Sequence, residues 1–516
     1  MDGTVQQLDE LCDRLGRLAD ELCRGSLRGG GSATARDEQL AAETIQTIQR
    51  IGEYVAWAYG QRQPRLGELF AQPFVDRRVR DQLKALLYET VHSPASAPWP
   101  RPDPSVPSRK RELRNGIAGQ ILQTIHILLQ ATPAESTLFS YLTAGWYLND
   151  VVSAPLDIWD TEDLLPLWMT VVKDIAIMLG PDNFMLFFDP TAEKPFPIFA
   201  EAVRFYHHPT AQVRTHVQAT SLEIFLKLRE RDACTEPIFE LVLKDASVFF
   251  THVCCLLRDF WKMVDDAMGT GASRRDARSA LSIQNDILVY VSDVMSCDIP
   301  ELTAVLQEKL LRFALLPVLI RSLLQGAIRR SVGAAAASAG EPWLLAPTTA
   351  AYLLEDVLAT LRGSTVFPTL GAALLRPEIP EGVAETVLGA PPRTPHQYLQ
   401  VQRLFGGAAD GQPPHGAGPP SKYDIASDEV LYQMPARDAT LAFVLEDRTA
   451  ATKGLVANRL LDLLQEQLGS FFAAADGTGA GQAIGGAGVE PPPEEAVAVL
   501  GALAALLRVL RSGRGG

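Results

Sequence analysis

The chain has 516 residues, 47% of them hydrophobic, and a formal net charge of −14. This apolar content is enough for a large buried core, which excludes an intrinsically disordered chain. The negative charge excludes general binding to nucleic-acid backbones, because such binding needs a basic surface.

The amino-terminal segment MDGTVQQLDELCDRL is acidic and amphipathic. It lacks the basic start and apolar stretch of a secretory signal and the arginine-rich composition of a transit peptide, so we expect a cytosolic chain. Five leucines within residues 1–27 share one helical face: Leu8, Leu11, Leu15, Leu18 and Leu22. This stripe predicts an N-terminal amphipathic helix that packs either on the first helices of its own chain or on the helix of a partner.

Apolar residues recur at intervals of three and four through residues 38–376, which is the spacing of amphipathic helices. The alternating pattern of strands is absent. Segments rich in Gly, Pro and Ser separate the helical runs, as at residues 93–108. We therefore predict an all-α fold, an armadillo/HEAT-like α-solenoid of irregular helical repeats.

The stretch WDTEDLLPLWMTVVKDIAIMLGPDN predicts one of these helices and its limits. Pro166 is tolerated in a first helical turn but not in a helix interior. The N-cap is therefore expected near Asp163, whose carboxylate can accept hydrogen bonds from the first backbone N–H groups. Gly180, followed by Pro181, is expected to end the helix.

Two adjacent histidines, His207 and His208, precede Pro209. Consecutive side chains point about 100° apart on a helix, whereas two ligands of one metal ion on a helix are three or four residues apart. Proline disfavours the α conformation in the preceding residue, so one helix should end here and another should start near Thr210. We predict a helix–turn–helix junction, with a metal site and a regulatory histidine pair as the alternatives. The second helix has one apolar stripe: Val213, Val217, Ile224 and Leu228.

Catalytic and cofactor motifs are missing from the sequence. The six cysteines, at positions 12, 23, 234, 254, 255 and 297, form no Cys-x-x-Cys pair and are predicted to be buried reduced thiols. With eight scattered histidines they cannot supply the ligands of a RING domain. No phosphate loop, Gly-x-Ser-x-Gly elbow or His-Glu-x-x-His motif occurs. Acid pairs such as Asp265 and Asp266 are interpreted as solvated helix termini. We expect no enzyme activity, no cofactor, no metal and no small-molecule substrate.

Residues 377–516 are predicted to be loosely organised, with Gly-, Ala- and Pro-rich linkers at 406–421 and 475–495. The terminal apolar helix expected at 496–511 is too short to span a bilayer. Three arginines close this tail: Arg508, Arg511 and Arg514. They can face anionic lipid headgroups if the tail lies in a membrane interface, and the alternative is that the tail docks on the helical region.

Residues 149–188 and 196–228 together resemble the FPL-domain family, which is named for a Phe-Pro-Leu motif. Isoleucine replaces the leucine here, in Phe196-Pro197-Ile198. The other positions that match the family pattern are Glu201, Pro209, Val213 and Arg214, and all seven are interpreted as architectural. The resemblance covers roughly residues 43–376. It implies an armadillo-like cytosolic protein, peripheral on endosomal, lysosomal, vacuolar or Golgi membranes, that acts in membrane trafficking and autophagy.

The function expected from this resemblance is that of a non-enzymatic scaffold for protein partners in the trafficking and autophagy machinery. Two alternatives stay open: a component or recruiter of a ubiquitin-ligase complex, and a subunit of a coat or adaptor.

Overall fold

The computed structural model describes residues 2–26, 32–61, 63–89, 108–133, 136–154, 210–269, 274–320, 322–323 and 345–361, and all of 156–208 except 157, 159, 160, 162, 182 and 193. The described residues divide into two compact units, with the boundary between Val242 and Leu243. The predicted linkers, the terminal helix at 496–511 and its three arginines lie outside the described residues.

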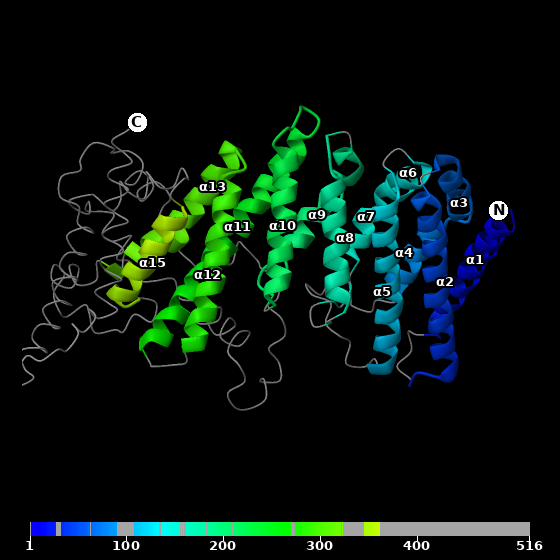
Figure 1. The fold of residues 1–516 in the computed structure, drawn as a ribbon, viewed down its shortest axis with the longest axis horizontal. Helices are drawn as coiled ribbons and strands as arrows, with labels where there is room; N and C mark the ends of the chain where they lie inside the picture. Colours follow the sequence, from blue (N-terminus) through cyan, green and yellow to red (C-terminus); the bar gives the residue numbers. More distant parts are fainter. Residues whose placement is uncertain are drawn as a thin grey trace, which may run out of the picture. The chain divides into compact units, whose positions relative to one another are not determined.

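Every regular element of the described residues is helical, which confirms the predicted all-α class for that part of the chain (Figure 1). The first unit contains α1 (Asp2–Glu21), η1 (Leu22–Ser26), α2 (Ala35–Gly60), α3 (Pro64–Asp76), α4 (Val79–Glu89), α5 (Ser108–Ala131), α6 (Thr137–Thr143), η2 (Ala144–Trp146), α7 (Tyr147–Ser153), α8 (Leu164–Met178), η3 (Phe184–Phe187), α9 (Pro197–Val203) and α10 (Ala211–Leu228). Helix α11 (Glu236–Gly269) crosses the boundary, and α12 (Arg274–Met295), α13 (Pro300–Leu310), η4 (Leu311–Ile320) and α15 (Pro347–Thr360) follow. No described helix is both long and apolar enough to cross a lipid bilayer.

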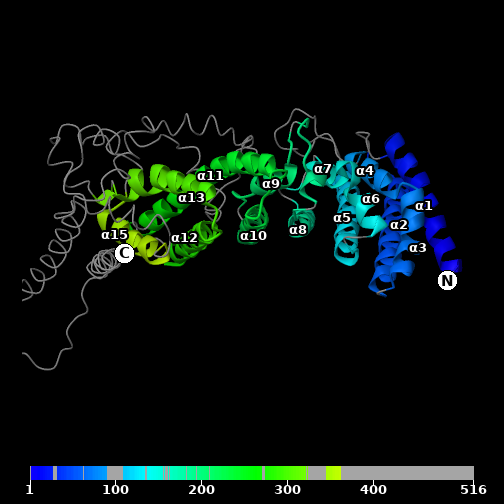
Figure 2. The ribbon, with the colours of Figure 1, turned by 90° about the horizontal axis from the view of Figure 1, so that it is seen from above.

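Helices α2, α5, α8 and α10 of the first unit pack one against the next, in chain order (Figures 1 and 2). The contact between α2 and α5 is close. A Cβ atom added to Gly52 would lie only 2.8 Å from Cγ2 of Thr124, so glycine is the residue that lets the two helices approach this far. Buried aliphatic side chains such as Ile48 and Ile121 fill the rest of this interface.

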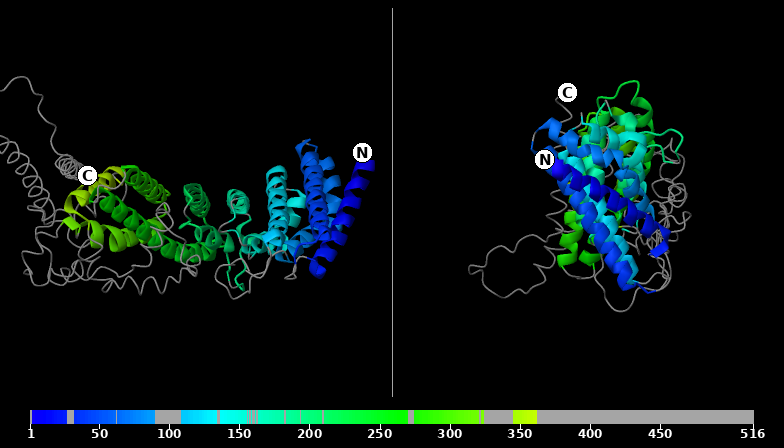
Figure 3. Two further views of the ribbon diagram at one scale, coloured as in Figure 1. Left: turned by 90° about the horizontal axis from the view of Figure 1, so that it is seen from below. Right: turned by 90° about the vertical axis from the view of Figure 1, so that its right-hand side faces the viewer.

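Helix α1 lies across the first helices of the unit (Figure 3), and burial of its leucines shows that this face is turned inward. Leu8, Leu15, Leu18 and Leu22 are buried against α2, α3 and α4, while Leu11 is partly exposed. Arg77 fastens α1 by donating to both carboxylate oxygens of Asp9, each at 2.9 Å. Of the two predicted roles for this stripe, packing within the chain is confirmed.

The predicted N-cap position of α8 is confirmed, because Asp163 is the N-cap residue. Its carboxylate makes no capping hydrogen bond, however, so the predicted capping role of the side chain is wrong. Its backbone is already helical, whereas a capping side chain usually needs an extended backbone to reach the first N–H groups. At the other end, Asn183 donates from Nδ2 to the Met178 carbonyl (2.7 Å) and accepts from the Gly180 N–H (2.9 Å).

The second unit is built around α11, which is buried on all sides from residue 251 to residue 261. Trp261 donates from Nε1 to Oε1 of Gln284 (2.6 Å), and Gln284 donates from Nε2 to Oδ2 of Asp356 (2.9 Å). This chain of hydrogen bonds joins α11, α12 and α15. Asp259 is fully buried in α11, and burial raises its pKa to about 7.

Two predictions about single side chains are wrong. Asp265 is not a solvated helix terminus, because it is mostly buried and accepts a 2.8 Å hydrogen bond from the Ala346 N–H just before α15. Cys234 is exposed in the turn before α11, whereas Cys12, Cys254, Cys255 and Cys297 are buried as predicted and Cys23 is partly exposed. All six cysteines are free thiols.

Candidate functional site

The Phe-Pro-Ile motif lies in the hydrophobic core of the first unit. Pro197 is the first residue of α9, where its missing N–H costs nothing. Phe196 and Ile198 are fully buried on either side of it, and the Phe196 ring lies 6.2 Å from the Phe184 ring of η3. Phe196 therefore packs the start of α9 against η3.

Glu201 of α9 is 2% exposed and is paired with two cations, Lys194 and Arg204. A carboxylate can be buried to this extent only when opposite charges and hydrogen bonds replace the lost water. Lys194 belongs to a loop closed by a 2.9 Å hydrogen bond from the Asp189 N–H to the Pro195 carbonyl. Glu201 therefore fastens this loop to α9.

The histidine segment is a junction between helices, as predicted. Helix α9 ends at Val203, a turn follows, and α10 begins at Ala211 with Thr210 as its N-cap. The helix thus ends five residues before His208, earlier than expected. Arg214 of α10 donates from Nη1 to the His208 carbonyl (2.9 Å). This hydrogen bond ties the turn to α10. Pro209 lies outside the described residues.

The predicted apolar stripe of α10 is confirmed, since Val213, Val217, Ile224 and Leu228 are all buried. The metal alternative gains no support. Within the described ranges, no group of three or more His, Cys, Asp and Glu side chains is placed to hold a metal ion. The His208 side chain instead accepts a 3.2 Å hydrogen bond from the Thr210 N–H at its Nδ1 atom.

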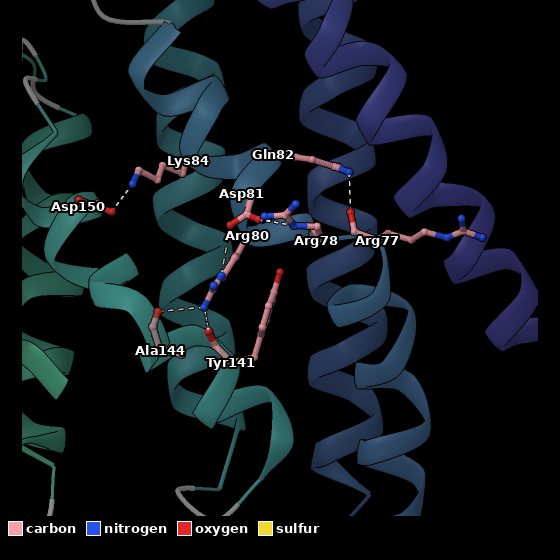
Figure 4. A network of polar contacts seen from close by, with 9 residues as sticks. All are labelled: Arg77, Arg78, Arg80, Asp81, Gln82, Lys84, Tyr141, Ala144 and Asp150. Atoms are coloured by element: carbon pink, nitrogen blue, oxygen red, sulfur yellow. Dashed lines mark hydrogen bonds and ion pairs between the residues drawn. The ribbon is translucent and has the colours of Figure 1, made fainter.

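A polar cluster that the sequence did not reveal lies where α4 meets α6 and α7 (Figure 4). We call it the α4 corner; it comprises Arg77, Arg78, Arg80, Asp81, Gln82 and Lys84 with Tyr141, Ala144 and Asp150. Arg80 is central. Its Nη1 atom donates to the carbonyl oxygens of Ala144 (2.9 Å) and Tyr141, and its guanidinium lies over the Tyr141 ring at 4.2 Å. Asp81 accepts from Nε of both Arg78 (2.8 Å) and Arg80 (3.3 Å).

The other end of α4 is fastened to α7. Lys84 forms an ion pair with Asp150, and the Tyr88 hydroxyl donates to the Asp150 carbonyl at 2.9 Å. Burial, together with the charges of Asp150 and Glu201, raises the pKa of Tyr88 to about 12, so this hydroxyl keeps its proton at neutral pH.

The α4 corner holds an unusual turn. Gly145 and Trp146 both have left-handed backbone conformations, with φ of 62° and 55°. Such a conformation is easy for glycine and unfavourable for tryptophan. A glycine between two helical runs indicates a turn in the sequence. The arginine that stabilises this turn could not be found in the same way, because it is more than sixty residues earlier in the chain.

A second polar contact joins α5 to α8. The buried carboxylate of Asp174 is bound by Nδ1 of His126 and accepts a 2.8 Å hydrogen bond from Nε2 of Gln130. On α10, burial and the nearby charge of Lys173 lower the pKa of His216. Like the α4 corner, the Asp174 contact connects one helix to another.

Comparison with known proteins agrees with the resemblance seen in the sequence. A family model described as "FPL: Uncharacterised conserved protein" matches residues 108–225, which run from the start of α5 into α10. This segment is an FPL domain. It contains the Phe-Pro-Ile motif, Glu201, Pro209, Val213 and Arg214, and also the turn at Trp146.

The chain also shows distant homology to known proteins over stretches longer than the FPL domain. The Drosophila melanogaster "Protein CLEC16A homolog" is 26% identical over 209 residues, which are 40% of this chain and 19% of that protein. The Homo sapiens "Protein CLEC16A" is 23% identical over 270 residues, 52% of this chain and 24% of that protein. "Protein TRANSPARENT TESTA 9" of Arabidopsis thaliana is 24% identical over 268 residues, 51% of this chain and 30% of that protein. The alignments thus span less than a third of each relative, and no solved structure matches the chain.

Proposed function

We propose that this protein is a non-enzymatic scaffold of the armadillo-like, α-solenoid type, which holds protein partners on endosomal, lysosomal, vacuolar or Golgi membranes. Its role is in membrane trafficking and the regulation of autophagy. The proposal rests on the distant homology described above and on what the resemblance to the FPL-domain family implies.

The observation that carries the proposal is the packing of the FPL domain. Helix α5 packs on α2 and α8, and α8 packs on α10, so each helix contacts mainly its neighbours in the row. A row of this kind leaves long outer faces on which partner proteins can bind, as in other helical-repeat proteins. The buried carboxylate of Asp174 in α8 pairs with His126 of α5 and so joins two neighbouring helices of the row.

The experiment is proximity labelling in living cells with the full chain fused to a biotin ligase. The ligase alone, expressed in the cytosol at the same level, is the matched control. We expect the fusion to enrich proteins of endosomal, Golgi and lysosomal or vacuolar membranes over the control. An identical set of labelled proteins for fusion and control would contradict the proposal.

The same experiment separates the two alternatives. Labelling confined to one coat complex, with co-purification in a fixed ratio, would replace the scaffold by an adaptor subunit. Labelling confined to ubiquitin-ligase subunits would replace it by a recruiter of that complex.

A further inference from the structure

Trp146 is presented to solvent by a strained turn. Its backbone is left-handed, and the residue is 44% exposed. A non-glycine residue in this conformation persists only where the surroundings enforce it, and such residues are concentrated at functional sites. Here Arg80 supports it by donating to the carbonyl oxygens of Tyr141 and Ala144, which both precede the left-handed pair. The fold thus maintains an unfavourable backbone conformation at Trp146, and this conformation places the indole ring at the surface.

Two further apolar side chains are exposed next to this turn. Helix η3 packs against η2, and its Met185 and Leu186 are both exposed. Asn149 of α7 fixes η3 by donating from Nδ2 to the Phe187 carbonyl at 2.9 Å. We call Trp146, Met185 and Leu186 the Trp146 patch. Its three members lie on the short helices η2 and η3. A hydrogen bond from α4 holds η2, and one from α7 holds η3.

Positive charge accompanies the patch. Arg78 and Arg80 share the single carboxylate of Asp81, so these three groups together carry one net positive charge (Figure 4). The Arg78 side chain is 79% exposed. The Arg80 side chain is only 19% exposed, and it is engaged in the hydrogen bonds to the turn. Lys84 is neutralised by Asp150. Arg77 pairs with both Asp9 and Asp13, so the cation of this corner that is most open to a ligand is the largely exposed Arg78.

We propose that the Trp146 patch is a membrane-contact site, which inserts Trp146, Met185 and Leu186 into the interface of an anionic lipid surface while Arg78 contacts the headgroups. Tryptophan favours the membrane interface because its ring is amphipathic. Apolar insertion beside a cation gives reversible binding that depends on anionic lipid. The inference rests on the proposed function and assigns its membrane association to named residues of the FPL domain and α4.

A lipid surface fits the patch better than a protein partner does. A stable protein–protein interface takes about 800 Å² from each partner, roughly 20 to 30 residues a side. Three exposed side chains on two short helices are much less than this. Weak peripheral binding to a bilayer, in contrast, increases with each inserted apolar side chain and needs no matching surface.

The test is co-sedimentation of the purified full chain with vesicles of phosphatidylcholine alone and of phosphatidylcholine with phosphatidylserine. We expect binding to the mixed vesicles and a loss of about tenfold for Trp146→Ala, since the indole supplies most of the inserted area. Alanine is strained in a left-handed backbone as tryptophan is, so this variant changes only the side chain. Arg78→Gln is expected to remove most of the difference between the two vesicles.

Trp57→Ala is the matched control, because Trp57 of α2 is similarly exposed, at 51%. Its binding should equal that of the wild type. Equal losses for both tryptophan variants, unchanged binding of Trp146→Ala, or no binding of the wild type to either vesicle would each overturn the membrane-contact site.

Proximity labelling with Trp146→Ala separates this inference from the proposed function. If the wild-type chain labels endomembrane proteins and Trp146→Ala labels the same set, the membrane-contact site is wrong and the scaffold proposal stands. If the wild-type chain labels none of them, the proposed function fails whatever the vesicles show. Loss of single labelled proteins without vesicle binding would assign the patch to a protein partner and overturn the lipid inference.

Discussion

Arg80 of α4 donates a 2.9 Å hydrogen bond to the carbonyl oxygen of Ala144, sixty-four residues later in the chain. Helix α4 precedes the FPL domain and Ala144 lies inside it, so this contact anchors the domain to the helices before it. Because the carbonyl belongs to the turn that ends at Trp146, the same contact also shapes the exposed indole.

Replacing Arg80 by alanine should loosen this turn. The variant loses hydrogen bonds from a charged donor to two carbonyl oxygens, each worth about 1.5–3 kcal/mol, so we expect a total loss of at least about 3 kcal/mol. Hydrogen exchange should show faster exchange of the amides of residues 141–147. Arg78→Ala is the control: its side chain is largely exposed, so the change should stay within about 0.5 kcal/mol. Equal protection of this segment in both variants would contradict the assigned role.

Glu201→Gln should destabilise the first unit by about 3 kcal/mol, because it leaves the paired cations Lys194 and Arg204 around a neutral group. Denaturant unfolding monitored by the first unit's hydrogen exchange measures the loss. Glu112→Gln is the control, since Glu112 is an exposed carboxylate paired with Arg109 at the start of α5. We expect at most about 1 kcal/mol for that surface pair. A loss for Glu201→Gln no larger than for Glu112→Gln would show that the buried pairs do not stabilise α9.

Gly52→Ala should destabilise the contact between α2 and α5 although alanine favours helices more than glycine does. The new Cβ atom would meet Cγ2 of Thr124 at 2.8 Å, and overpacking of this kind costs about 1–3 kcal/mol. Gly60→Ala, at the end of the same helix, meets nothing within 4 Å and should be neutral or stabilising.

The second change that tests this contact is Thr124→Ser, which removes the Cγ2 atom. The double variant with Gly52→Ala should regain most of the lost stability, and a thermodynamic double-mutant cycle measures the coupling. Additive effects of the two substitutions would mean that the helices separate instead of clashing.

Stability of the second unit should fall as the pH rises from about 4 to about 7. The pKa of Asp259 is raised to about 7 by burial, above its ordinary value, so the folded state holds a proton that the unfolded state releases at lower pH. Asp356 has a pKa of about 6 for the same reason and acts in the same direction. Each unit of elevation corresponds to about 1.4 kcal/mol.

Asp259→Asn keeps the neutral, protonated shape at every pH. Its free energy of unfolding, measured in urea at pH 5 and at pH 7.5, should decrease less between the two than that of the wild type. Parallel decreases in both proteins would show that Asp259 does not titrate in this range.

Local patterns in the sequence predicted what local physics determines. The leucine spacing of α1, the buried stripe from Val213 to Leu228 and the break at the histidines all follow from helical period and proline geometry, and all three are confirmed. The missed features depend on distant residues. The N–H that Asp265 accepts from belongs to Ala346, and the carbonyls that Arg80 binds belong to another helix. The sequence alone gives no sign of such distant partners. It therefore predicts a solvated Asp265 and does not distinguish Arg80 from other arginines.

The inward leucines of α1 have a consequence for how the first unit behaves in a crowded solution. A row of packed helices without a cover would present an apolar face at its end, to which the end of another molecule could add, and so on into a filament. Helix α1 covers α2, α3 and α4 with its apolar side, exposes Glu10 and pairs Asp13 with Arg77 at 3.2 Å. It therefore buries apolar surface of α2, α3 and α4 that would otherwise be open to another molecule.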